Sequence, residues 1–167
     1  GRLALTDEEY KWCLANIYFI PQYYFEWLKG FRYNPDIIKI FLDEEGHLHI
    51  EATDLIYKVT LYEIPILSTV SEVYFRTYQN IEPDWDYIDR QLEKKVAISN
   101  DNKLKFANFG MRRRYSHEME DYVTGYLARN AKYFIGSSTV YFAMKYQSVR
   151  EDIKPIGTMA HELMMAT

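Results

Sequence analysis

The segment FGMRRR, residues 109–114, holds the densest group of side chains able to do chemistry. It directly follows a predicted strand, and its glycine permits tight curvature of the backbone. Arginine guanidinium groups bind phosphates and carboxylates through paired hydrogen bonds, so this segment could hold an anionic ligand. A solvated basic turn before a helix is the alternative interpretation, and it is the commoner one for an isolated run of charge.

A second segment, Gly136-Ser137-Ser138-Thr139, again joins a predicted strand to a predicted helix. Small hydroxyl residues at such a junction leave backbone N–H groups open to an anion or to a polar ring substituent. The alternative is an ordinary helix N-cap, because serine and threonine are preferred at that position.

The third segment is GTMAHE, residues 157–162, which combines a strand end with a hydroxyl and a His–Glu pair. His161 could act as a general base, a metal ligand or a phosphoryl acceptor, although a single histidine is more often structural or merely exposed. His47 and His49 lie two apart on a predicted strand, so no pair of histidines has the spacing of a zinc site. The sequence matches no P-loop, GxGxxG or GxSxG pattern.

All three segments fall at the carboxyl ends of successive predicted strands. From Leu104 onward strands and helices alternate, which is typical of a parallel α/β sheet. Ligand sites of α/β proteins gather at that edge of the sheet. The agreement favours one binding site over three unrelated turns.

The elements before residue 104 predict a different, α+β organisation. Thr6 and Glu9 form a capping box at a helix start, and Pro21 and Gly30 bracket a second helix. Residues 37–42, 47–51 and 54–62 have the β-branched or alternating character of strands, and they predict a three-stranded antiparallel sheet. Pro65 is expected to open a helix. A loop is expected at residues 99–102. Before it, four apolar residues have a spacing that suits one helical face: Trp85, Ile88, Leu92 and Val96.

The predicted fold class is therefore mixed. An N-terminal α+β domain, residues 1–103, resembles an α/β sandwich with an antiparallel sheet. Residues 104–167 supply the first elements of an irregular α/β barrel. Since a sheet of about three strands would leave much of its surface uncovered, we expect the chain to be part of a longer protein.

Composition limits the classes of function. The 167 residues carry 20 Lys plus Arg and 24 Asp plus Glu, a net charge of −4, which argues against a nucleic-acid coat or a protein that binds anionic membranes. No apolar run reaches the roughly 20 residues of a membrane-spanning helix, and no signal peptide is recognisable at the start. Cys13 is the single cysteine, which fits a reducing compartment such as the cytoplasm.

Several stretches together resemble the nicotinate phosphoribosyltransferase family: FGMRRRYSHEMEDYV, KYFIGSSTVYFAMKY, KPIGTMAHELMMA and, upstream, ALTDEEYKWC, YFEWLKGFRYNP and LYEIPILSTVSEVY. The resemblance implies a type II phosphoribosyltransferase that makes nicotinate mononucleotide and pyrophosphate in NAD biosynthesis. The implied substrates are nicotinate and phosphoribosyl pyrophosphate, with ATP hydrolysis coupled to the transfer and Mg²⁺ as the metal. A homodimer with active sites between subunits is also implied.

The same resemblance assigns roles to individual residues. Phe109 matches the ring that stacks on the pyridine, and Arg112 matches an arginine near the phosphoribosyl phosphates, with Arg113 and Arg114 assisting. Gly157 and Thr158 match the segment that contacts nicotinate. His161 matches the catalytic histidine that ATP phosphorylates. No metal ligand is assigned within the chain.

Ser138 bears on the choice of substrate. Relatives that use the amide carry an aspartate at this place, whereas an uncharged serine does not repel a carboxylate. This favours nicotinate over nicotinamide, and the GTMAHE segment disfavours a quinolinate-using relative.

Two departures from the family's usual text fall in these segments. Met111 replaces the threonine of FGTRRR, and GSST replaces GTSN. They keep open an alternative of another class, a non-catalytic relative that acts as a binding or regulatory protein.

Overall fold

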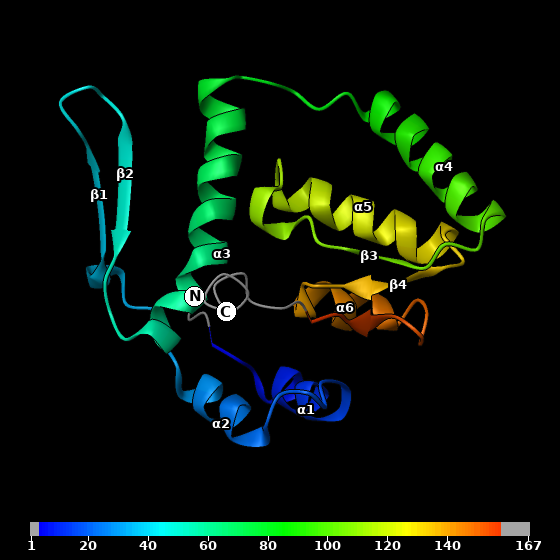
Figure 1. Cartoon of the computed structure of the whole chain (residues 1–167), viewed down its shortest axis with the longest axis horizontal. Coiled ribbons are helices and arrows are strands. Elements are labelled where there is room, and N and C mark those ends of the chain that lie inside the picture. The colour runs from blue at the N-terminus through cyan, green and yellow to red at the C-terminus, as the bar shows by residue number, and fades with distance from the viewer. Residues whose placement is uncertain (1–3, 158–167) are drawn as a thin grey trace, which may run out of the picture. The chain divides into compact units, whose positions relative to one another are not determined.

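The computed structural model describes residues 4–157, which form parts of two compact units, Gly1–Leu67 and Ser68–Thr167 (Figure 1). The described part of the first unit contains two helices, a short 3₁₀ turn, one β-hairpin and the beginning of a third helix: α1 (Asp7–Asn16), α2 (Gln22–Gly30), η1 (Pro35–Ile37), β1 (Ile38–Leu42), β2 (Leu48–Ala52) and α3 (Ile56–Val73).

The second unit continues from the end of α3 through a π-helical turn and then alternates strands with helices. Its elements are η2 (Tyr74–Tyr78), α4 (Trp85–Asp101), β3 (Phe106–Asn108), η3 (Met111–Arg113), α5 (His117–Asn130), β4 (Phe134–Ser137), α6 (Val140–Gln147) and β5 (Lys154–Pro155). The domain boundary expected after residue 103 stays a prediction.

The first helix begins where the capping box predicts. The Thr6 hydroxyl accepts a hydrogen bond from the backbone N–H of Glu9 at 3.2 Å, and the Glu9 carboxylate accepts one from the N–H of Thr6 at 2.8 Å. Two otherwise unpaired N–H groups of the first turn are thereby satisfied. Pro21 is the N-cap of α2, and Gly30 is its last residue, as predicted.

The predicted three-stranded antiparallel sheet is wrong in one strand. β1 and β2 pair antiparallel, with Ile40 opposite Ile50, but residues 54–62 belong to the loop before α3 and to that helix. Val59, Tyr62 and Ile66 fit the helical period, and Tyr62 is buried on the face that this spacing defines. The β-branched residues that suggested a strand are tolerated in the helix because tertiary contacts override propensity.

Pro65 does not open a helix as predicted but lies inside α3. Proline has no N–H, so the carbonyl of Leu61 cannot receive its usual hydrogen bond from position 65. The Tyr33 hydroxyl donates to that carbonyl at 3.1 Å instead. The Tyr33 ring also packs edge-on against Tyr62, with 4.9 Å between centroids. A side chain outside the helix therefore supplies the hydrogen bond that the proline removes.

The second unit confirms the predicted alternation. β3, β4 and β5 are parallel in the order β3-β4-β5, with α5 and α6 as the crossover helices. α4 forms with its apolar residues on one face, as predicted, although it extends to Asp101 through most of the expected loop. The apolar core of this unit is formed by residues of α4, α5, α6 and β4: Leu92, Val96, Leu127, Ala128, Phe134, Phe142 and Tyr146.

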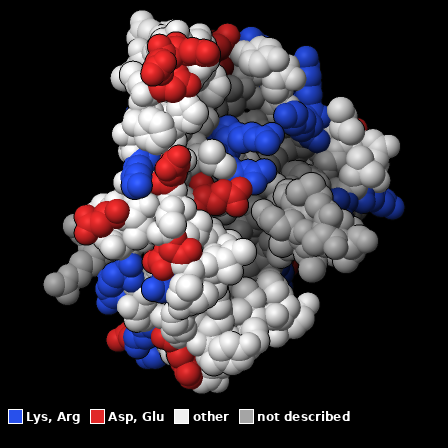
Figure 2. Space-filling model, turned by 60° about the vertical axis from the view of Figure 1, so that its left-hand side comes forward, with Lys and Arg blue, Asp and Glu red and all other residues white. Residues whose placement is uncertain are grey.

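Both signs of charge occur on the face of the molecule drawn in Figure 2. Within the part of the chain that the structure describes, no helix has both the length and the apolar character needed to cross a membrane.

The arrangement at Pro65 gives a testable prediction. Tyr33→Phe should lower the free energy of unfolding by about 1 kcal/mol, because the Leu61 carbonyl loses its donor. In a Pro65→Ala background the loss should shrink, since the new N–H at position 65 can donate to that carbonyl. Urea denaturation of the four proteins measures both costs. Equal costs of Tyr33→Phe in the two backgrounds would show that its hydroxyl does not replace the missing helical donor.

Candidate functional site

The carboxyl ends of three adjacent strands form one edge of the parallel sheet. In the register of the sheet, Asn108 of β3 is opposite Ser137 of β4, and Ser137 is opposite Pro155 of β5. Two hydrogen bonds continue this pattern past the strands: Ser138 N–H donates to the Asn108 carbonyl at 2.9 Å, and Ile156 N–H donates to the Ser137 carbonyl at 3.0 Å. The segments that follow the three strands are therefore held side by side.

This edge brings together five of the seven residues selected from the sequence. Phe109 follows β3 and is 50% exposed, so part of its side chain is accessible to a ligand. Arg112 is half-buried and Arg113 is exposed in η3, Ser138 is half-buried after β4, and Gly157 is exposed after β5. Thr158 and His161 lie outside the described residues, so their placement stays a prediction.

Arg114 differs from its two neighbours. Its side chain is only 13% exposed, and its Nη2 atom lies 3.6 Å from the Glu72 carboxylate. Nη1 donates to the Met111 sulfur at 2.7 Å, and the Arg114 carbonyl accepts from the Ser71 hydroxyl at 2.9 Å. These contacts fix the turn against the end of α3, so Arg114 serves the fold.

Residues 109–114, which follow β3, form the Phe109 turn. A polar network that the sequence did not reveal connects the start of this turn to α5. Asn108 Nδ2 donates to the Glu120 carboxylate at 2.7 Å and to the Thr124 hydroxyl at 2.9 Å. Asn108 Oδ1 accepts the backbone N–H of Gly110 at 3.1 Å. Glu120 and Thr124 are both buried on α5. The sequence shows only their spacing of four residues, which puts two polar side chains on one helical face without revealing their partner.

Burial raises the pKa of Glu120 above its ordinary value, while the hydrogen bond from Asn108 and the charge of Arg114 act in the opposite direction. Gly110 lies very close to this carboxyl group. Its φ of −75° is open to any residue, but an added Cβ would lie 2.6 Å from a Glu120 oxygen. Glycine therefore lets the turn approach α5 closely.

Gly136 in β4 is explained by the close approach of the neighbouring strand, β5. Its φ is +150°, which L side chains rarely adopt, and a Cβ there would overlap the carbonyl oxygen of Lys154 in β5. The pairing of these two strands, and thus the position of Gly157 beside Ser138, depends on this glycine.

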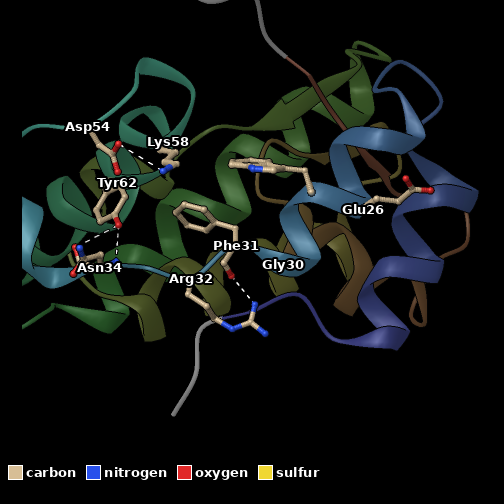
Figure 3. A pocket seen from close by; sticks show the side chains of 9 residues that line it. Glu26, Gly30, Phe31, Arg32, Asn34, Asp54, Lys58 and Tyr62 are labelled. Carbon is tan, nitrogen blue, oxygen red and sulfur yellow. Dashed lines mark hydrogen bonds and ion pairs between the residues drawn. The ribbon is translucent and has the colours of Figure 1, made fainter.

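The first unit contains a separate pocket of about 540 Å³ between residues of α2, α3 and the chain that joins α2 to η1 (Figure 3). Its charged side chains already have partners. Lys58 Nζ lies 3.7 Å from the Asp54 carboxylate, and Arg32 donates to the carbonyls of Lys29 and Phe31 at 2.9 and 2.6 Å. None of the residues selected from the sequence lines this pocket, so the sheet edge is the better candidate.

Residues 4–157 contain no group of three or more His, Cys, Asp or Glu side chains that could hold a metal ion. The described part of the edge instead offers an aromatic ring, two arginines and a serine. A parallel α/β sheet with these groups at its carboxyl edge has the chemistry to bind a planar, anionic ligand.

Comparisons with known proteins identify the family. Residues 1–71 match the nicotinate phosphoribosyltransferase (NAPRTase) N-terminal domain, and residues 104–167 match the nicotinate phosphoribosyltransferase (NAPRTase) family. The chain therefore belongs to the nicotinate phosphoribosyltransferase family.

Individual relatives agree with this assignment. The chain is 35% identical to nicotinate phosphoribosyltransferase of Methanosarcina mazei over 99% of its own length, and 33% identical to that of Yersinia enterocolitica. The crystal structure of nicotinate phosphoribosyltransferase from Porphyromonas gingivalis matches with a TM-score of 0.87 and 37% identity over 96% of this chain. The chain spans 43%, 41% and 40% of the lengths of these three relatives.

The strand pairing at Gly136 can be tested by mutation. Gly136→Ala should lower the free energy of unfolding by about 2 kcal/mol or more, because the new Cβ is strained by the positive φ and overlaps the Lys154 carbonyl. Gly30→Ala is the matched control, since a Cβ there meets nothing within 4 Å. Thermal and urea denaturation would measure both variants. A Gly136→Ala protein as stable as the control would contradict the close approach of β4 and β5.

Proposed function

We propose that this chain forms the nicotinate-binding part and some of the phosphate-binding part of an enzyme that makes nicotinate mononucleotide and pyrophosphate from nicotinate and phosphoribosyl pyrophosphate. One observation carries the proposal: Phe109, Arg112, Arg113, Ser138 and Gly157 follow the carboxyl ends of adjacent parallel strands. Membership of the family supports it, and the product would serve NAD biosynthesis.

Nicotinate would lie against Phe109 and Ser138. A half-exposed phenyl ring at a strand end suits stacking on a flat pyridine ring. The N–H of Ser138 is already bonded to Asn108, so its hydroxyl is the polar group that it offers to a ligand. That hydroxyl carries no charge and can donate to a carboxylate, which favours nicotinate over its amide.

Arg112 and Arg113 would bind the phosphates of phosphoribosyl pyrophosphate. In the transfer the pyridine nitrogen forms a bond to the anomeric carbon, and the bond to pyrophosphate breaks with its electron pair on the leaving oxygen. The guanidinium groups of these two arginines would stabilise the charge that develops on that oxygen. Among residues 4–157 no three His, Cys, Asp or Glu side chains are grouped to hold Mg²⁺, which the substrate phosphates can themselves bind.

His161 would couple ATP to the transfer. A neutral imidazole nitrogen can accept the terminal phosphoryl group of ATP, as the bond between that phosphorus and the bridging oxygen breaks and ADP leaves. The added negative charge would alter the affinity for substrates close by. We also propose a cytoplasmic homodimer, on the resemblance to the family and the single, buried Cys13.

The first test is nicotinate-dependent release of pyrophosphate by the full-length product of the gene that contains this sequence. We expect release from phosphoribosyl pyrophosphate that ATP stimulates, with nicotinate preferred over nicotinamide and quinolinate. The physical reason for the preference is the uncharged Ser138. A folded full-length protein that releases no pyrophosphate with any of the three would overturn the proposal and favour a non-catalytic relative.

The role of His161 has its own prediction. His161→Ala should abolish the stimulation by ATP and leave a weak, ATP-independent transfer, because the other substrate-binding groups stay in place. Pyrophosphate release with and without ATP measures this. Stimulation by ATP that survives the substitution would exclude His161 as the phosphoryl acceptor.

A specific role of Arg112 can be distinguished from a general effect of positive charge. Arg112→Ala should raise KM for phosphoribosyl pyrophosphate roughly 10- to 100-fold, the loss expected for a charge-assisted hydrogen bond of about 1.5–3 kcal/mol. Lys132→Ala removes the same charge just before β4, at the opposite edge of the sheet, and should leave KM unchanged. Equal KM values in both variants would reject the assignment of Arg112.

A further inference from the structure

Asn108 is hydrogen-bonded to both segments that would hold the pyridine ring. Its carbonyl accepts from Ser138 N–H at 2.9 Å, and its side-chain oxygen accepts from Gly110 N–H at 3.1 Å. Phe109 lies between the two bonded positions of the β3 turn. A shift of Asn108 would therefore change the distance between the Phe109 ring and the Ser138 hydroxyl.

Glu120 of α5 holds the Asn108 side chain in place. The Glu120 side chain is buried, with 7% of the residue exposed, and its carboxylate accepts from Asn108 Nδ2 at 2.7 Å. Thr124 accepts the second hydrogen bond from the same amide at 2.9 Å. With both N–H groups of the amide occupied on α5, its oxygen is turned toward the backbone of Gly110.

We propose that Asn108 and Glu120 are positioning residues, which hold the Phe109 turn at the separation from Ser138 that a flat pyridine carboxylate requires. The inference rests on the proposed function. It adds two residues that touch no substrate and act through the Phe109 turn and Ser138.

The hydrogen bonds of this network involve other side chains than the apolar core and the Arg114 ion pair do. The apolar core is formed by residues such as Leu92, Phe134 and Phe142, and Arg114 fixes the far end of the same turn against Glu72. Removal of the Glu120 carboxylate would therefore release the Phe109 end of the turn while the other end stays fixed. A preorganised site that loses this restraint binds its ligand more weakly, because ordering the turn then costs entropy on binding.

The test measures KM for nicotinate and kcat in the full-length gene product. Glu120→Ala and Asn108→Ala should each raise KM for nicotinate about tenfold. Glu120→Gln keeps an oxygen that can accept from Asn108, so its KM should stay within about threefold of the unsubstituted protein. Asp121→Asn is the matched control, since Asp121 is the next residue of α5 but binds Lys145 and Tyr146 of α6 at 2.6 and 2.8 Å. It should leave KM unchanged even where it lowers the melting temperature.

A double substitution tests the contact itself. Gly110→Ala should raise KM for nicotinate, because the new Cβ displaces the Glu120 carboxylate. In a Glu120→Ala background the same change should have little further effect, since the carboxylate is no longer there. Multiplicative effects of the two substitutions would contradict action through one contact.

The outcomes separate this inference from the proposed function. If the unsubstituted protein releases no pyrophosphate, the proposed function fails. If it is active but Glu120→Ala and Asn108→Ala lower only the melting temperature, as Asp121→Asn does, the network is merely structural and the inference is overturned. A tenfold rise in KM that Glu120→Gln rescues supports it.

Discussion

The turn that follows β3 at the carboxyl edge of the sheet is held by the hydrogen bonds of a single side chain, the Asn108 amide. An amide has two donors and one acceptor oxygen, and here all three groups are used at once, on Glu120, Thr124 and Gly110. The backbone of the same residue binds Ser138 of the next strand. Because a buried polar group without partners is costly, each of these contacts favours the others, and the Phe109 turn has one satisfied arrangement.

Two glycines permit this arrangement for different reasons. Gly110 has an ordinary φ, and a Cβ there would have to displace the Glu120 carboxylate. Gly136 has a positive φ and lies directly against the backbone of Lys154. One lets a turn approach a helix, and the other lets two strands approach each other. The site is thus assembled by close backbone packing before any ligand is bound.

The sequence predicted those features that depend on neighbours along the chain. The capping box of Thr6 and Glu9 is local, and the alternation of strands and helices after Leu104 reflects short apolar runs between amphipathic segments. Residues 54–62 were mispredicted because their apolar positions fit both periods and Pro65 usually begins a helix. The Tyr33 hydroxyl that makes an internal proline tolerable is 28 positions from Leu61. The Asn108–Glu120 contact likewise depends on how α5 crosses β3, which no local pattern encodes.

The three consecutive arginines have different roles because of the geometry of the turn that carries them. A 3₁₀ helix has three residues per turn, so successive side chains point about 120° apart and cannot all face one ligand. In η3 and the residue after it, this directs Arg114 toward Glu72 and the Met111 sulfur, while Arg113 stays exposed. Arg114, whose charge is paired within the fold, fixes the C-terminal end of the turn. Asn108 fixes the near end, and the residues between the two ends, Phe109 to Arg113, are the ones that the proposed reaction requires to be held in place.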